Sequence, residues 1–420
     1  MGGKASLFLV IGFSLIFMIA GRNFNNMAGD TTDNMINYFY DTKTHQMAAS
    51  GINLVVSRLY TDINCQDGTY NFNFDGGAIL VTLRTTDYIL NKKELISVGS
   101  ITTGGKTYSS TFRVIMKPSY FSKFAYFSDN EGYNINWSGK DTIWGPMNTN
   151  GSIQFSGNSV FHGEVSIGGA VTYNRNHPIF DKGLIKNYLI TLPASGIDTV
   201  KKYAGGGYQF TGHSVVYFEF RKDSVRYRYS TSGSGSTWTY KLASTFAPNG
   251  VILANNAELH ISGTVQGKYT IAASGTSGNL GDVYLDDDIK YYIRPDLTLD
   301  PPGSNSTDML GIIANSDVIV TDNVPNNSNI TIEAAIYAGS GSFKVQNYDQ
   351  KKYYPLNSNR GFINLFGGIT QKTRGAVGTG DGNTISTGYG KRYRYDERLL
   401  YSHPSAYPGV GTFEIVSWFE

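Results

Sequence analysis

An acidic run between residues 282 and 300 is the strongest candidate for a binding site in this sequence. The acids of the run are Asp282, Asp286, Asp287, Asp288, Asp296 and Asp300. Three adjacent carboxylates repel one another, and Ca²⁺, which takes about six to eight oxygen ligands, would relieve that repulsion. On a strand, Asp286 and Asp288 would share one face and Asp287 would point to the other. Two interpretations stay open: a calcium site formed by Asp282, Asp286 and Asp288, and a solvated loop after Leu285.

No catalytic motif is recognisable elsewhere in the chain. The 6 histidines are isolated from one another, and the sequence has no nucleophile elbow, phosphate-binding loop or zincin helix. The 1 cysteine, Cys65, excludes an intrachain disulfide and a thiolate metal cage. We therefore expect a protein that is not an enzyme and that has no cofactor, with calcium as the one exception to test.

The aromatic residues also have two interpretations. The chain contains 30 Tyr, 23 Phe and 4 Trp. Rings in this number are typical of packing on strand faces and between subunits, and they are also typical of a sugar-binding platform. A surface glycan is therefore an alternative partner.

Composition and charge narrow the class of protein. The 420 residues have 35 Lys+Arg against 33 Asp+Glu, a net charge of +2, and the basic residues are scattered. A nucleic-acid partner is excluded on this ground, because it requires a clustered basic surface. Only 16% of the residues are charged, and Gly, Ser, Thr, Asn and Tyr are abundant, which is typical of secreted all-β proteins.

The first structural element predicted along the chain is an apolar segment near the N-terminus. Residues Ala5 to Ala20 contain no charge, and as a helix they would reach roughly 24 Å, short of the hydrocarbon layer of about 30 Å. A signal peptide is the competing interpretation, with Lys4 as its basic end. Against it, the bulky Met18 lies three residues before the cleavage point at Gly21, where a small side chain is expected.

A helical stripe of apolar and small residues follows, from Phe24 to Leu59, without a proline. Joined to the apolar segment, it would make a helix of about 56 residues and roughly 84 Å, longer than one globular domain buries. The alternative is two helices, broken near Gly21 or Gly29, with the second lying on the domain. In the long-helix interpretation the first half packs against copies of itself.

This N-terminal pattern resembles type IV pilins and type II secretion pseudopilins, above all minor pilins with large C-terminal domains. The resemblance rests on the leader MGGK, the uncharged apolar stretch, and the segment from Tyr40 to Tyr60 with its small residues Ala48 to Gly51, which would permit close approach of helices. It implies leader cleavage after Gly3. The family's usual glutamate, fifth in the processed chain, is Phe8 here. The residues expected on the assembly helix are Leu7, Val10, Ile11, Gly12, Ser14, Leu15, Met18, Phe24, Met27 and Met35.

After Cys65 the pattern changes to short alternating runs bounded by Gly, Asn and Asp. Strands are predicted at Ala78 to Leu83, Leu95 to Val98 and Tyr108 to Met116, with turns at Asp75-Gly-Gly and Thr103-Gly-Gly. Further short strands follow turn residues at Asn150, Asn256, Asn315 and Gly339. A β-solenoid and a β-sandwich both stay open. Helical turns are predicted within Ser119 to Phe127 and Ser195 to Ala204, and a hairpin excursion between Tyr208 and Leu242.

The predicted class is thus a long N-terminal α-helix followed by a mainly-β domain. Its parts are an apolar membrane or filament-core segment 1–23, an amphipathic helix 24–62, a first β part 63–190, a short helix with a β-hairpin insertion 191–248, a solenoid-like short-strand part 249–390 and a C-terminal tail 391–420 packed on the β domain. The expected function is that of a structural subunit of a bacterial surface filament. The expected partners are copies of the chain or other pilin-like subunits, with the inner membrane before assembly. The alternative is a membrane-tethered carbohydrate-binding or adhesive module.

Overall fold

The structure is a computed structural model, and two compact units make it up. One unit is Met1–Ser119 with Gly411–Glu420, and the other is Tyr120–Val410. The described residues are 2–62, 65–87, 91–132, 135–137, 141–173, 177–193, 196–230, 236–296, 306–350, 359–380 and 384–420. Met1 of the predicted leader, Ser195 and Asp300 lie outside them. The boundary between Ser119 and Tyr120 falls inside the predicted part 63–190.

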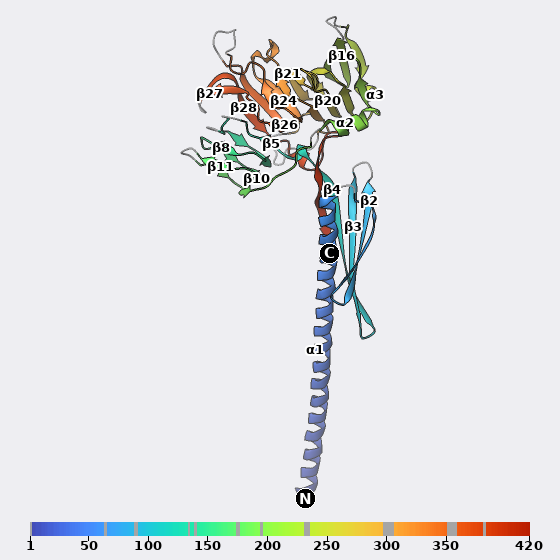
Figure 1. Ribbon diagram of the computed structural model, residues 1–420. Coiled ribbons are helices and arrows are strands. Elements are labelled where there is room, and N and C mark those ends of the chain that lie inside the picture. Colours follow the sequence, from blue (N-terminus) through green and yellow to red (C-terminus); the bar gives the residue numbers. More distant parts are fainter. Residues whose placement is uncertain are drawn as a thin grey trace. The chain divides into compact units, whose positions relative to one another are not determined.

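A single helix, α1 (Gly2–Thr61), forms the first half of the smaller unit (Figure 1). The prediction of one continuous helix is confirmed, and the alternative of two helices is wrong. Neither Gly21 nor Gly29 interrupts α1, because a lone glycine costs only about 1 kcal/mol in a helix interior and removes no backbone hydrogen bond. The prediction of a mainly-β chain behind a long N-terminal helix is confirmed as well.

The last turns of α1 lie on a five-stranded sheet with the strand order β1-β2-β3-β4-β29. Its strands are β1 (Gly68–Phe74), β2 (Gly77–Asp87), β3 (Lys92–Thr103), β4 (Lys106–Tyr120) and β29 (Gly409–Phe419). The first four strands are antiparallel neighbours. Both predicted turns are present: Asp75 and Gly76 have φ of 49° and 78°, and Gly104 and Gly105 have φ of 56° and 75°. Residues 409–419 of the predicted tail thus form the edge of this sheet.

The small residues Ala48 and Gly51 of α1 were predicted to permit close approach of another helix, but they face the sheet of the same chain. Ala48 and Gly51 are buried against the chain's own sheet, and a Cβ atom on Gly51 would lie 2.4 Å from Ser97 Oγ. They therefore permit close approach of helix to sheet, not of helix to helix. The apolar side chains of this core include Met47, Ile52, Val55, Val56, Leu59, Ile79, Val81, Leu83, Leu95, Ile101, Phe112, Val114, Met116 and Phe413.

The larger unit begins with a stack of very short parallel strands. They are β5 (Tyr126–Asn130), β6 (Thr142–Ile143), β7 (Met147–Thr149), β8 (Ile153–Phe155), β9 (Val160–Phe161), β10 (Val165–Ile167), β11 (Val171–Tyr173), β12 (Ile179–Phe180) and β13 (Leu184–Lys186). Parallel pairs run through β6-β9-β12, β5-β7-β10-β13 and β8-β11. Equivalent side chains meet one turn apart: Asn148 Nδ2 donates to Ser166 Oγ, 18 residues on, at 2.7 Å.

A second stack of parallel strands follows, with longer members. They are β14 (Tyr208–Phe210), β15 (Val215–Lys222), β18 (Val251–Ala254), β19 (Glu258–Val265), β20 (Lys268–Ala273), β21 (Val283–Tyr291), β22 (Met309–Ala314), β23 (Val318–Val320), β24 (Ile330–Ala338), β25 (Phe343–Val345), β26 (Gly361–Thr373), β27 (Gly378–Gly380) and β28 (Ile385–Arg394). Most strands pair in parallel with the strand two places on, through β14-β18-β20-β22-β24-β26 and β15-β19-β21-β23-β25. This succession is that of a β-solenoid, whereas a sandwich is built from antiparallel hairpins.

The predicted hairpin excursion is present but begins differently. β16 (Ser224–Ser230) and β17 (Thr239–Leu242) form an antiparallel extension, while β15 pairs both with β16 and, in parallel, with β19 of the solenoid. The hairpin is therefore an outgrowth of a solenoid turn. The remaining helical elements are η1 (Phe121–Lys123), α2 (Ile197–Ala204), α3 (Ala243–Phe246), η2 (Pro325–Asn327) and η3 (Glu397–Leu400).

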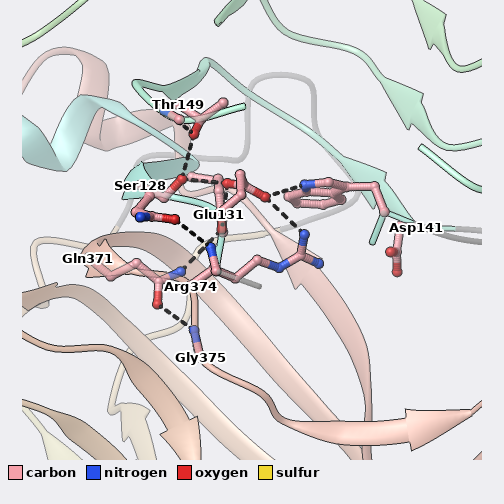
Figure 2. Close-up of polar contacts among 12 residues, drawn as sticks. Ser128, Glu131, Asp141, Thr149, Gln371, Arg374 and Gly375 are labelled. Carbon is pink, nitrogen blue, oxygen red and sulfur yellow. Dashed lines mark hydrogen bonds and ion pairs between the residues drawn. The ribbon is translucent and has the colours of Figure 1, made fainter. Parts of the chain in front are cut away.

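A buried ion pair holds the junction of the two stacks, where β5 pairs in parallel with β26. Glu131, from the segment after β5, lies at its centre, close to Ser128 and Arg374 (Figure 2). Arg374 Nη1 donates to Glu131 Oε2 at 3.0 Å, and Trp137 Nε1 donates to the same oxygen at 2.7 Å. Glu131 is 3% and Arg374 5% exposed, and the guanidinium lies 4.2 Å from the Trp137 ring centroid. Ser128 bridges Glu131 and Thr149 within the first stack, and Arg374, which follows β26, joins this network to the second stack.

Candidate assembly surface

The N-terminal part of α1 buries none of its described side chains. Its first contacts with the sheet are those of Asn37, which accepts from Lys106 at 2.7 Å and from Tyr108 at 3.0 Å, and of Lys43, which pairs with Asp75 at 2.8 Å. From Gly3 to Lys43 no side chain of the helix is buried. Exposed residues include nearly all those predicted for assembly, namely Leu7, Val10, Ile11, Leu15, Met18, Phe24, Met27 and Met35, together with Ser14. Gly12 is of intermediate exposure. We call residues 3–43 the exposed half of α1 and residues 44–61 the covered half.

The exposed half contains a stretch that is long and apolar enough to cross a membrane. Its most apolar window has a mean hydropathy of 2.0 and is 0% buried. A signal sequence near an N-terminus has the same length and composition, so this property alone does not separate the two. What distinguishes α1 is that the apolar stretch continues without a break into the covered half, which is part of a folded core.

Three hydroxyl groups of the exposed half are satisfied within the helix. Ser14 Oγ donates to the Val10 carbonyl at 2.8 Å, Thr31 Oγ1 to Met27 at 2.7 Å and Thr32 Oγ1 to Ala28 at 2.9 Å. Between Lys4 and Arg22 the sequence has no charge, and no acid precedes Asp30. The stretch can therefore enter lipid or an apolar bundle without leaving a polar group unpaired.

Gly12 and Gly3 lie in the exposed half, and they are the residues predicted for close helix approach and for leader cleavage. A Cβ atom on Gly12 would meet nothing within 4 Å, so the space beside Gly12 is open to a partner. Gly3 likewise has open space around it and lies inside α1. Cleavage after Gly3 stays a prediction.

The structure separates the predicted calcium ligands. Asp282 precedes β21, while Asp286 and Asp288 lie within that strand, which corrects the alternative of a solvated loop after Leu285. Asp282 accepts from the Asp317 amide at 2.9 Å, and its burial raises the pKa of this carboxyl to about 6. Asp286 accepts from Thr321 Oγ1 at 2.6 Å.

Asp288 has partners of its own, the Thr331 amide at 2.7 Å and the Lys290 ammonium. Each predicted ligand is thus engaged with a different part of the solenoid. Over the described ranges, no group of three His, Cys, Asp or Glu side chains is arranged to hold a metal ion. The calcium site stays a prediction, which melting curves with calcium and with a chelator would test.

A cluster of aromatic and acidic side chains around His260, on the solenoid, is a feature that the sequence did not indicate. The His260 ring stacks between Tyr217, at 4.6 Å, and Tyr284, at 4.7 Å, which occupy the same position on β15 and β21. Its ring nitrogens contact Glu258 at 2.7 Å and Asp286 at 2.9 Å. Burial alone would lower the pKa of His260, but these hydrogen bonds outweigh it and raise the pKa to about 9. The sequence does not reveal that Tyr217, His260 and Tyr284 are register partners, because the solenoid turns between them differ in length.

The comparisons with known proteins are sparse. No family model matches the chain, and no curated protein matches it. Among solved structures the chain is similar to the competence-associated pilin ComZ from Thermus thermophilus, with 12% sequence identity, 84% of this chain and 86% of that chain covered, and a TM-score of 0.38.

Proposed function

We propose that the chain is a structural, non-enzymatic subunit of a bacterial surface filament, in which the exposed halves of α1 from many copies form the core and the β units face outward. Before assembly the same stretch anchors the subunit in the inner membrane. The partners are copies of the chain or other subunits of the same build.

The observation that carries the proposal is the exposed apolar half of a helix whose other half belongs to a folded core. Apolar surface in water costs about 25 cal/mol per Å², so the rows of Leu, Ile, Val, Phe and Met on this half require cover. A bilayer covers a stretch of this length, and so does a bundle of identical helices. Because α1 is a single rod, the movement of the stretch from lipid into such a bundle requires no refolding.

The folded core at the far end of the rod supports a filament over a removable targeting segment. Cleavage near Gly21 would leave residues 22–43 of α1 as an exposed helix that extends beyond its sheet. Met27 and Met35 on that remainder are exposed apolar side chains, and Phe24 is exposed as well. A subunit interface explains these residues, whereas a signal peptide does not.

Two measurements on the native organism test the proposal. Electron microscopy of sheared surface material, with antibody labelling of the β units, is expected to show labelled filaments. Mass spectrometry of the mature chain is expected to find an N-terminus that retains Ala5 to Ala20. A chain that begins after Ala20, or that occurs only as a membrane-released monomer, would refute the filament function.

A further inference from the structure

A polar hollow of about 420 Å³ lies on the outer face of the second solenoid stack. Its walls come from β15, β16, β19 and β21, and its volume lies in the range of small-ligand sites. The residues that line it include Glu219, Arg226, Ser262, Thr264, Asp288 and Lys290. None of them belongs to the surface proposed above for assembly.

A local irregularity in the strand pairing creates the hollow. Ile261 pairs with Leu285 and Gly263 pairs with Ile289, so Ser262 alone stands opposite the residues 286–288. The extra residues of β21 bulge from the sheet and place Asp287 and Asp288 at the rim. Gly263 has φ of 109°, and a Cβ atom there would lie 2.0 Å from the Phe220 carbonyl oxygen, so the irregularity requires a glycine.

Charged groups on both sides of the hollow are held in place before any ligand arrives. Arg226 Nε donates to Glu219 Oε2 at 2.6 Å, and its guanidinium lies 4.4 Å from the Trp238 ring centroid. On the other side Lys290 pairs with Asp288. Preorganised donors and acceptors lower the entropy that a ligand loses on binding.

The floor between these pairs offers free hydroxyl groups. Ser262 and Thr264 occupy alternate positions on β19 and so face the same side. In the part of the chain that the structure describes, neither hydroxyl has a protein hydrogen-bond partner. Each can both donate and accept a hydrogen bond.

An aromatic side chain adjoins the polar groups. Tyr240 on β17 is the register partner of Arg226, and its side chain is 56% exposed. A pyranose ring likewise has an apolar part and a polar part. Its face of C–H groups packs on an aromatic ring, and its hydroxyl groups need hydrogen-bond donors and acceptors. The lining carries three carboxylates, of Glu219, Asp287 and Asp288, against the two cations Arg226 and Lys290. This balance disfavours an anionic ligand.

We propose that this hollow binds a neutral saccharide of hexose or N-acetylhexosamine units. The sugar hydroxyls bond to Ser262, Thr264 and the two ion pairs, and an apolar sugar face packs on Tyr240. In a filament subunit the site would make the outward surface adhesive, but the proposal does not depend on assembly.

The test uses the full-length chain in a detergent without a sugar headgroup, such as lauryldimethylamine oxide, on an array of immobilised neutral and acidic oligosaccharides. We expect binding to neutral members and competition by the same saccharide free in solution. Ser262→Trp, which fills the hollow, and Arg226→Ala, which removes a wall, are each expected to weaken binding at least tenfold. The matched control is Lys344→Ala. It removes an ion pair with Asp317 that lies outside the hollow and is about as exposed as the Lys290–Asp288 pair, so it should leave binding unchanged.

Three results would overturn the proposal: no binding to any neutral saccharide, a preference for acidic ones, or wild-type binding by both Ser262→Trp and Arg226→Ala. Circular dichroism of each variant verifies that the fold is retained. Ile11→Asp, which should block filaments, is expected to keep saccharide binding, so failure of this proposal is distinguishable from failure of the filament function.

Discussion

The two halves of α1 have similar apolar side chains and opposite surroundings. In the covered half Ile52 and Leu59 are fully buried on the sheet, whereas in the exposed half Ile11 and Leu15 are 47% and 52% exposed. The helix is continuous between them, so local conformation does not cause the difference. The covered half buries its apolar side chains on a sheet of its own chain, whereas the exposed half buries none and reaches that sheet at its last turns, through Asn37, Tyr40 and Lys43.

This contrast shows that one continuous helix has two different environments in series. Side chains of the covered half contribute to the stability of the smaller unit, and side chains of the exposed half are available for another molecule. A substitution should therefore change either folding or assembly, depending on the half in which it lies. The first three of the following predictions test that separation, and the fourth tests the stability of the smaller unit alone.

The largest expected effect is the loss of assembly on Ile11→Asp. A buried carboxylate without a partner costs several kcal/mol per subunit, and no cation lies between Lys4 and Arg22 to pair with it. We expect no filaments in sheared material, with unchanged circular dichroism of the β units. The matched control is Asn53→Asp, which adds the same charge on the exposed side of the covered half. Normal filaments from the Ile11→Asp strain would contradict the assignment of the exposed half to assembly.

The next effect concerns the same residue type in the two halves. Leu59→Ala should destabilise the smaller unit by about 2–5 kcal/mol, because it leaves a cavity in a closed core. Leu15→Ala should leave folding unchanged, because its side chain has no partner to lose. Hydrogen exchange of the β2 and β3 amides measures both changes. Equal exchange in the two variants would mean that the covered half is not part of the core.

Two glycines give the third comparison. A Cβ atom on Gly51 would lie within 2.9 Å of Ser97, Ile79 and Val81, so Gly51→Ala should cost about 1–3 kcal/mol of stability. Gly12→Ala meets nothing within 4 Å and should raise the stability of the isolated helix by up to about 1 kcal/mol. If Gly12 permits close helix approach, the same change should shorten or weaken filaments. Urea unfolding and filament counts report the two effects separately.

Acid should produce the smallest effect, and in the smaller unit Glu94 is one of the groups that cause it. Glu94 lies on the sheet face opposite α1: its burial raises the pKa, but hydrogen bonds from Arg84 and Arg113 outweigh this and hold the pKa below the ordinary value. Because the folded pKa is the lower one, this stabilisation is complete above about pH 4.3 and is lost as the pH falls through the folded pKa. Melting temperatures between pH 7 and pH 3 measure the change, and Glu94→Gln should reduce the pH dependence.

Several features were predictable because they depend on neighbouring residues. The absence of proline and the spacing of apolar residues predicted the helix from residue 5 to Leu59, and Asp75-Gly-Gly and Thr103-Gly-Gly predicted their turns because these residues adopt positive φ. The four short strands after Asn150, Asn256, Asn315 and Gly339 are present as β8, β19, β23 and β25. Alternating side chains identified them.

The features that were not predictable depend on residues far apart in the chain. Glu131 and Arg374 are 243 residues apart and meet only because β5 pairs with β26. The same holds for Tyr217, His260 and Tyr284, which stack because three solenoid turns are in register. No local pattern marks such a contact, since the turns between those strands differ in length.

The sequence by itself determined the helix, the turns, the strand-rich class and the uncharged apolar stretch from Ala5 to Ala20, because backbone preference and side-chain periodicity act over a few residues. Only the tertiary structure decided that Ala48 and Gly51 face a sheet instead of another helix, that the acids of β21 have separate partners, and that the second half of α1 is covered while the first is not. These outcomes depend on which surfaces the folded chain brings together, and that is a property of the packing of distant segments.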